Sequence, residues 1–574
     1  MPSKPLVNQA SSIFRKNQER SWGICLWVSL VAALFYGLID LQTAFSGDWV
    51  VQDDARQHVF WLLRYVDPEL FPNDAISDYF QSVAPWGYTS LYKLGIAWGF
   101  DPFVLSKLMP IPLRIITAYY FFAWCRTIFP VPLGCLISTL LLNQSLWLKD
   151  DLVSATPRAF LYPLFIAFLY YFSRQALIPC LLAIVGLSLF YPQMVFLAWG
   201  MLLLKLISWR GGKLQINRRQ PERNFALVGL LVGFLVLLPY ALKTSDYAPV
   251  ITRTEALTMP EFHYNGRSNF FKGTIWEYLI GRGNAVLIST GVFKPVILLV
   301  GLFLPWLRKK STQYSLAQKI TPQFASVSQL LLVSLGMYLL AHAVLFKLHL
   351  PSRYTVHSLR IAINLCAGLT LTIWLDRLWH NWQNKYSPTK AKLLLATTIT
   401  AIALISYINF LDPGSPTGYK FGQHPQLYKY LQQQPKDIVV ASLIREADNL
   451  PSFAQRSVLV SREYAIPYQL GYYRPFSDRV RALISAQYSP DPAEVSQVIK
   501  QYKLTYWLLE DRSFDLEYFQ KNRWLKQFQA EYQQALETLS SQQTPLILTK
   551  QANCTVVQSQ NLTLLDTACL IKTN

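Results

Sequence analysis

The stretch that decides the fold is residues 22–44, WGICLWVSLVAALFYGLIDLQTA. A helix that crosses a membrane needs roughly 20 mostly apolar residues, and this run meets that length. Runs of similar character follow as far as residue 410. Window hydrophobicity predicts about eleven membrane spans. They are placed at 22–44, 103–124, 131–148, 156–172, 177–190, 192–207, 225–242, 285–307, 327–346, 356–375 and 393–410, with the fifth and sixth short enough to form a tight hairpin instead.

The composition agrees with a polytopic α-helical membrane protein. Hydrophobic residues make up 52 % of the 574 residues and charged residues only 15 %, against about 25 % in a soluble protein. No small-residue cleavage site follows the first run, which therefore reads as a retained span rather than a signal peptide. The net charge of +20 comes from basic residues dispersed between spans, a distribution that argues against nucleic-acid binding.

The basic loops orient the spans. They fall at the N-terminus and after the predicted sixth, eighth and tenth spans. Their basic residues are Lys4, Arg15, Lys16 and Arg20; Arg210, Lys213, Arg218, Arg219 and Arg223; Arg308, Lys309, Lys310 and Lys319; and Arg377, Lys385, Lys390 and Lys392. With residues 1–21 in the cytoplasm, all four groups lie inside, as the positive-inside rule requires. We therefore expect a multi-pass protein of the plasma (inner) membrane, with a membrane domain at 22–411.

Two details follow from this orientation. The first outer loop covers 45–102, and its moderately apolar part, 84–100, must be interfacial, since counting it as a span would put the basic loops outside. Arg114 then lies near the middle of the second span, where a charge usually faces a protein interior or a water-filled cavity. We expect a cavity.

Residues 412–574 read as a separate extracytoplasmic domain, because eleven spans with the N-terminus inside leave this part of the chain outside. Strand-like runs at 437–444, 457–464 and 504–511 alternate with helical patterns at 425–433, 492–502 and 518–540, which favours an α/β domain. Cys554 and Cys569 lie here and could pair as a disulfide if the compartment is oxidising. The other five cysteines lie within or beside apolar runs and are expected to be packing residues.

Two acidic pairs are predicted to share the outer face. Asp53 and Asp54 follow the first span in GDWVVQDDARQHVFWLLRYV, ahead of a segment patterned as an interfacial helix, with Arg56 on its polar side. Asp150 and Asp151 follow the third span. Adjacent carboxylates repel, so each pair needs a cation, a proton or a basic partner. The alternative is that both pairs are ordinary solvated loop residues.

Cations are expected on the same face. The segment KLHLPSRYTVHSLR, before the predicted tenth span, holds Arg353 and Arg360, and arginine binds phosphate oxygens in a bidentate manner. Arg353 follows Pro351 at the start of a helix and is the preferred lipid-phosphate ligand, although snorkelling at a helix end is the simpler alternative. His349 and His357 are expected to form hydrogen bonds rather than bind metal.

These features resemble the GT-C superfamily of membrane glycosyltransferases. The segment QDDARQH after the first span, KDD in the second outer loop and the order of spans over about 400 residues carry the resemblance. It implies that Asp53 and Asp54 are catalytic, that Asp150 and Asp151 form a second acidic group, and that Arg353 holds the lipid phosphate. Arg360 and Arg114 are further candidates for binding that phosphate. A divalent cation (Mg²⁺ or Mn²⁺) on Asp53, Asp150 and Asp151 is left open, and no WWD-type motif occurs in the tail.

The implied reaction is an inverting transfer of a hexosyl or pentosyl group. A polyprenyl-phosphate-linked sugar would enter from the lipid bilayer and glycosylate an unknown glycan, lipid or protein on the extracytoplasmic face. Asp53 would act as general base and Arg353 would neutralise the departing phosphate. The alternatives are a membrane transporter, which Arg114 favours, and a non-catalytic scaffold for envelope assembly.

Overall fold

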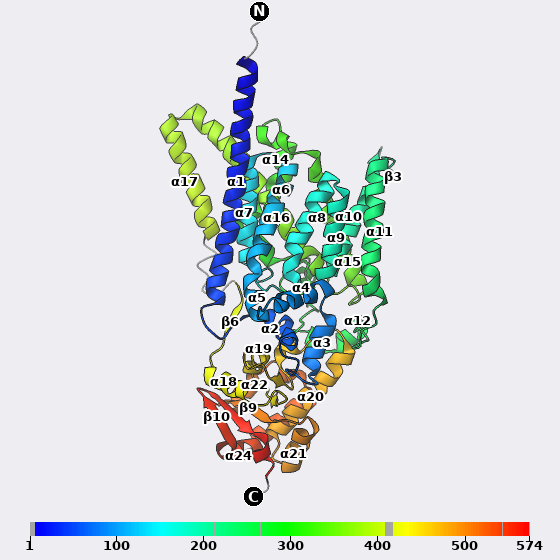
Figure 1. The fold of residues 1–574 in the computed structure, drawn as a ribbon, viewed down its shortest axis with the longest axis vertical. Helices are drawn as coiled ribbons and strands as arrows, with labels where there is room; N and C mark the ends of the chain where they lie inside the picture. Colours follow the sequence, from blue (N-terminus) through cyan, green and yellow to red (C-terminus); the bar gives the residue numbers. More distant parts are fainter. Residues whose placement is uncertain (1–5, 211–212, 265, 408–416, 542, 573–574) are drawn as a thin grey trace, which may run out of the picture.

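The computed structural model describes residues 6–572 except 211–212, 265, 408–416 and 542. A bundle of helices forms one end of the elongated molecule and a small domain with a β-sheet forms the other (Figure 1). The first outer loop lies between them. The predicted boundary between residues 411 and 412 lies outside the described residues, so both domain limits stay predictions.

Five helices in the described part of the chain are long and apolar enough to cross a membrane. They are Glu19–Ala44, Pro102–Ile128, Gln220–Leu242, Pro322–Ala343 and Arg353–Lys385, and two shorter apolar helices cover Leu177–Phe190 and Pro192–Lys205. Three of these ranges, Pro102–Ile128, Pro322–Ala343 and Pro192–Lys205, each join two consecutive helical segments. The predicted spans at 131–148 and 156–172 correspond to shorter helices of the bundle, and the one at 393–410 overlaps a helix that ends at Tyr407.

The bundle helices have well-defined limits. They are α1 (Leu6–Ala44), α6 (Pro110–Ile128), α7 (Pro132–Trp147), α8 (Leu161–Arg174), α9 (Leu177–Phe190), α10 (Val195–Lys205), α11 (Gln220–Leu242), α15 (Ala325–Ala343), α16 (Arg353–Lys385) and α17 (Pro388–Tyr407). A hairpin of β2 (Ile207–Arg210) and β3 (Lys213–Ile216) joins α10 to α11. The predicted fifth and sixth spans correspond to α9 and α10, which are two separate helices.

Helix α16 is the centre of the bundle, with 72 % of its most apolar window buried. It packs against α7, α15 and the 3-10 segment Val296–Phe303. At Gly368 the helices approach so closely that a Cβ would meet the backbone of Ser138 at 2.5 Å. Small residues allow this kind of approach between membrane helices.

The predicted span at 285–307 is wrong as a continuous helix. Residues 280–281 and 288–289 form the short parallel strands β4 (Ile280–Gly281) and β5 (Ile288–Ser289), and 3-10 turns follow at Thr290–Phe293 and Val296–Phe303 before α14 (Leu304–Lys309). Pro295 and Pro305 each lack the N–H that a continuous α-helix requires. Hydropathy detects the apolar run but not this interruption.

The first outer loop folds into short elements. They are β1 (Val50–Gln52), α2 (Ala55–His58), the 3-10 helix η1 (Phe60–Tyr65), α3 (Ala75–Val83), α4 (Trp86–Ala97) and α5 (Pro102–Leu108). Helix α4 covers most of the segment 84–100. Its 12 residues correspond to about 18 Å, too short to cross a hydrocarbon core of about 30 Å. Short helices α12 (Arg253–Thr258) and α13 (Ile275–Leu279) lie in a later loop.

The small domain contains a five-stranded sheet in the order β10-β11-β9-β7-β8. Strands β7 (Val439–Ala441), β8 (Ser457–Val458) and β9 (Tyr506–Glu510) are parallel and coincide with the three predicted strands. Strands β10 (Thr555–Ser559) and β11 (Leu562–Asp566) add an antiparallel hairpin. The surrounding helices are α18 (Pro425–Gln433), α19 (Leu450–Phe453), α20 (Leu470–Tyr488), α21 (Pro492–Gln501), α22 (Leu516–Lys521), α23 (Gln529–Ser540), α24 (Leu546–Cys554) and α25 (Thr567–Leu570).

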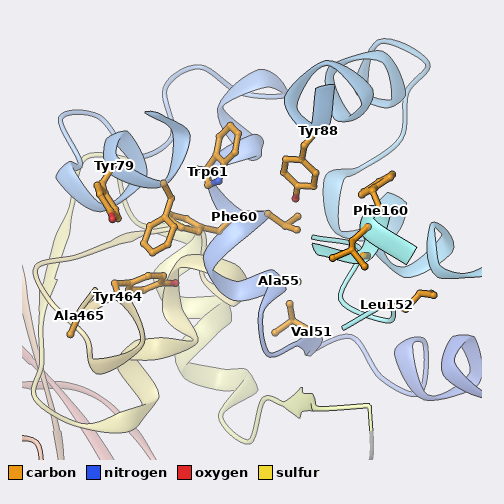
Figure 2. Close-up of a cluster of buried hydrophobic side chains, with 14 of the residues drawn as sticks. Val51, Ala55, Phe60, Trp61, Tyr79, Tyr88, Leu152, Phe160, Tyr464 and Ala465 are labelled. Atoms are coloured by element: carbon orange, nitrogen blue, oxygen red, sulfur yellow. The ribbon is translucent and has the colours of Figure 1, made fainter. Parts of the chain in front are cut away.

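A shared core joins the first outer loop to both ends of the molecule. Phe60 and Trp61 are fully buried, and Figure 2 shows Tyr464 of the small domain on one side of the loop and Tyr88 and Phe160 on the other. Strand β1 also pairs antiparallel with β6 (Tyr419–Phe421), which opens the small domain. The loop is therefore held between the bundle and the small domain.

Candidate functional site

Strand β1 fixes the first acidic pair. The backbone N–H of Asp53 donates to Gly418 O at 3.0 Å, and that of Asp54 donates to Gln52 Oε1 at 2.8 Å. The side chains of Asp53 and Asp54 are 36 % and 32 % exposed. Because strand pairing and a local side-chain bond hold the backbone, the two carboxylates are positioned rather than loose, and both remain reachable.

Arg158 brings the two acidic pairs together. Its guanidinium forms an ion pair with Asp54, lies 3.0 Å from Asp151 Oδ1 through Nε, and reaches within 3.9 Å of Asp150. Lys149 lies 2.7 Å from Asp150. The prediction that both pairs share one face of the molecule is confirmed. The basic partner, Arg158, was missed, although it follows the second pair closely in KDDLVSATPRAF.

Asp151 is the buried member of the cluster, with 1 % of its side chain exposed. The Tyr162 hydroxyl donates to its Oδ2 at 2.9 Å and lies 2.9 Å from Nδ1 of His357. Burial acts to raise the pKa of Asp151, but Arg158 first, then Lys149 and His357, outweigh it and hold the pKa well below its usual range. The hydrogen-bonding role predicted for His357 is confirmed, and Asp151 is a fixed anion.

Asp53 faces the small domain. It pairs with Arg56 and lies 3.6 Å from Lys420 of β6. Arg56 in turn lies 3.5 Å from Glu463. The prediction of an interfacial helix with Arg56 on its polar side is wrong, because α2 and η1 are short and Arg56 is buried against the small domain. The polar face of the pattern meets protein rather than water.

Arg353 acts on the groups of this cluster and, unlike Arg158 and Lys149, forms no ion pair within the described residues. Its Nε is buried and has no hydrogen-bond partner. The pKa of His58 is lowered to about 4, mainly by burial. Arg158 and Arg353 also lower this pKa, whereas Asp54 acts to raise it. His58 is therefore neutral near pH 7, and the charges of both Asp54 and Arg353 act on it. We expect Arg353 to attract an anion.

The other two predicted phosphate ligands already have protein partners. Arg360, buried in α16, donates to Ser145 O at 2.7 Å. Arg114 is buried and paired with Asp40 of α1 at 2.5 Å. The expected cavity at Arg114 and its role in binding lipid phosphate are corrected, because a carboxylate already neutralises this guanidinium. Asp40 lies inside the first apolar run, where periodicity gave no sign of its partner.

The carboxylates do not fit a divalent metal as they are arranged. Asp53 is paired with Arg56 and Lys420, and Asp54, Asp150 and Asp151 surround Arg158. In the part of the chain that the structure describes, no three His, Cys, Asp or Glu side chains converge as ligands. The predicted metal site at Asp53, Asp150 and Asp151 is replaced by guanidinium and ammonium partners, and no step is derived through a metal.

Solved structures of one enzyme share this fold. The apo oligosaccharyltransferase of Archaeoglobus fulgidus has a TM-score of 0.53 at 12 % identity, over 86 % of this chain and 70 % of that one. The same archaeal oligosaccharyltransferase, AglB, with an inhibitory peptide and a dolichol-phosphate gives 0.52 at 11 % identity, over 86 % and 70 %. Its complex with zinc and sulfate gives 0.50 at 11 % identity, over 86 % and 69 %.

No protein-family model and no curated protein matches the chain. The structural likeness nevertheless extends over most of both chains. The likeness shows that the chain has the fold of the archaeal oligosaccharyltransferase. The chain is a mostly helical membrane protein with this fold.

Proposed function

We propose that the protein is a glycosyltransferase that moves a sugar from a polyprenyl-phosphate-linked donor to an acceptor on the extracytoplasmic face. The observation that carries this proposal is the position of Arg353, which forms no ion pair in the described part of the chain and acts on His357, the neighbour of Asp151. Carboxylates alone attract cations, whereas an unpaired arginine next to them provides a place for a phosphate. The archaeal enzyme of the same fold was solved with a dolichol-phosphate, which supports a lipid phosphate as the anion.

The orientation is part of the proposal. We place the N-terminus in the cytoplasm and the small domain outside, with about eleven membrane passages in the plasma membrane, following the positive-inside rule. The two termini lie at opposite ends of the molecule (Figure 1). The small domain carries a disulfide between Cys554 and Cys569, and disulfides persist in oxidising compartments. This supports an extracytoplasmic location for the domain and the adjoining cluster.

The reaction proceeds as a single displacement. Asp53 accepts the proton of the acceptor hydroxyl as its oxygen forms a bond to the anomeric carbon. The bond between that carbon and the phosphate oxygen breaks, and the electron pair leaves with the lipid phosphate. The configuration at the anomeric carbon inverts. General base catalysis of this kind contributes about 10²–10⁴-fold.

The remaining groups have separate tasks. Arg353 stabilises the charge on the departing phosphate, an electrostatic contribution to the transition state. Arg158 holds Asp54 and Asp151 in place and offsets their repulsion. The donor is a hexosyl or pentosyl lipid phosphate, and the acceptor is a glycan, lipid or protein. The transporter alternative loses its main support, because Asp40 neutralises Arg114.

The test uses the full-length protein in nanodiscs with a radiolabelled sugar on polyprenyl phosphate. Water takes the place of the unknown acceptor hydroxyl, so the measured reaction is hydrolysis of the donor. Asp53→Asn should lower the rate of sugar release at least about 100-fold. Asp48→Asn is the matched control, because Asp48 is exposed in the same loop and should leave the rate unchanged. A folded Asp53→Asn protein with the wild-type rate would rule out Asp53 as the base.

A further inference from the structure

A second pocket lies in the small domain, at the edge of its sheet. Its volume is about 570 Å³. Leu443, Ile444 and Arg445 follow strand β7, while Glu510 ends strand β9, and these residues form part of its wall. The pocket therefore lies at the carboxyl ends of two neighbouring parallel strands. None of the groups described above at Asp53 and Asp151 lines it.

The strand order makes this edge a natural binding position. From β7 the chain first passes to β8 on one side and then to β9 on the other side of β7. Connections that leave two adjacent strands in opposite directions open a crevice between them. Open α/β sheets bind their ligands in this crevice, outside the carboxyl ends of the strands. The topology alone thus places a ligand site between β7 and β9.

The charge of the pocket indicates an anion. Arg445, Arg462 and Arg523 all line it. Within the described residues they form no ion pair, whereas other arginines of the domain, such as Arg481 and Arg512, do. Burial and then the nearby Arg445 and Arg267 lower the pKa of Arg462. Like charges held together without counter-charges are costly, and an anionic ligand would remove this cost.

The single acidic group of the pocket wall does not fill this role. Glu510 accepts a hydrogen bond from the Tyr518 hydroxyl and forms no ion pair with any of the three arginines in the described part of the chain. It leaves a wall that carries three guanidinium groups and one carboxylate. The balance remains positive.

Aromatic side chains complete the pocket. Tyr488, Tyr518 and Trp524 line it. Trp524 is 3 % exposed, and its indole N–H has no hydrogen-bond partner in the described residues. A buried indole N–H usually has a partner. Aromatic rings beside arginines suit the apolar face of a sugar ring whose substituent is charged.

The pocket is linked to the site of the proposed transfer. Arg462 directly precedes Glu463, which lies 2.8 Å from Arg267 and 3.5 Å from Arg56. Arg56 pairs with Asp53. An acceptor held in the pocket would thus be anchored on the side of the small domain that contacts the proposed base.

We propose that this pocket binds a carboxylate or phosphate group of an anionic saccharide acceptor. This inference rests on the proposed transferase function, because a transferase needs a second substrate besides the lipid-linked donor. The archaeal structures contain peptides in two cases, so an anionic saccharide is a distinct expectation for this chain.

The test measures equilibrium binding to the full-length protein in nanodiscs by calorimetry. The probes are tetragalacturonic acid, glucose 6-phosphate and the neutral maltotetraose. The variant Arg445→Gln/Arg523→Gln removes two exposed guanidinium groups and should preserve the fold. The control Arg474→Gln/Arg481→Gln removes two exposed arginines that lie outside the pocket wall.

At least one anionic probe should bind to the wild-type protein. Its affinity should be at least tenfold lower for the pocket variant and unchanged for the control. Tetragalacturonic acid alone would indicate a carboxylate, and glucose 6-phosphate alone a phosphate. Absence of binding by both, equal binding by the pocket variant, or equal binding of maltotetraose would overturn the inference. Hydrolysis of the lipid-linked donor by the pocket variant should persist, so failure here is separable from failure of the proposed transfer reaction.

Discussion

Replacing Arg158 with alanine tests the buried centre of the site. Arg158 and Asp151 have side chains only 15 % and 1 % exposed, and the guanidinium is the nearest cation to this carboxylate. Removing one partner of a buried ion pair costs about 3–5 kcal/mol, because the other charge is left uncompensated. Tyr162 and His357 still contact Asp151, which places the expected loss of unfolding free energy near the lower end, about 3 kcal/mol.

A double-mutant cycle separates this pair from other effects of the change. Asp151→Asn in the Arg158→Ala background removes the stranded charge, so we expect a coupling energy of about 2 kcal/mol. Unfolding free energies are measured by denaturant titration in mixed micelles. The control is Arg512→Ala, whose exposed pair with Asp515 at 3.5 Å should contribute less than about 1 kcal/mol.

The pH dependence adds an independent check. In Arg158→Ala the buried Asp151 can relieve its charge by taking up a proton, so the loss of stability should be smaller at pH 5 than at pH 8. A cost below about 1 kcal/mol, or a coupling energy near zero, would show that Arg158 does not hold the two acidic pairs together.

Three further outcomes are expected. Burial raises the pKa of Glu463 from its usual 4.5 to about 7. Between these pH values the folded protein keeps a proton that the unfolded chain has lost, so stability should fall by about 3 kcal/mol as pH rises from about 4.5 to 7. Glu463→Gln should therefore flatten the pH profile of the melting temperature. Donor turnover should survive EDTA, because arginine and lysine already offset the carboxylates; loss of turnover that Mn²⁺ restores would contradict this. In intact cells, treatment with an impermeant reductant should increase the labelling of Cys554 and Cys569 by an impermeant maleimide. The variant Cys554→Ser/Cys569→Ser should abolish this increase in labelling. Labelling that occurs only after permeabilisation would place the tail in the cytosol.

Much of the bundle could be predicted because its signal is local. The predicted span at 177–190 coincides with α9, and the first apolar run ends with α1 at Ala44. The same local reading placed both acidic pairs on one face. Apolar length, however, does not report breaks such as those at Pro295 and Pro305, so the span at 285–307 was wrong.

The partners in the site could not be predicted because they come from distant parts of the chain. Arg56 lies on the polar side of its helical pattern, and only the fold shows that Glu463, 407 residues further along, covers it. The pair between Arg114 and Asp40 is likewise formed by two different helices. Periodicity shows which face is polar but does not show which residue will meet it.

Binding of a polyprenyl phosphate to Arg353 is the most direct test of the proposed function. We would titrate the protein in nanodiscs with undecaprenyl phosphate and compare wild type with Arg353→Gln and with Arg282→Gln, an exposed arginine in an adjacent outer loop. A charge-assisted contact of about 1.5–3 kcal/mol predicts roughly 10- to 100-fold weaker binding for Arg353→Gln and no change for Arg282→Gln. Equal affinity of wild type and Arg353→Gln would contradict a lipid-phosphate site at this arginine.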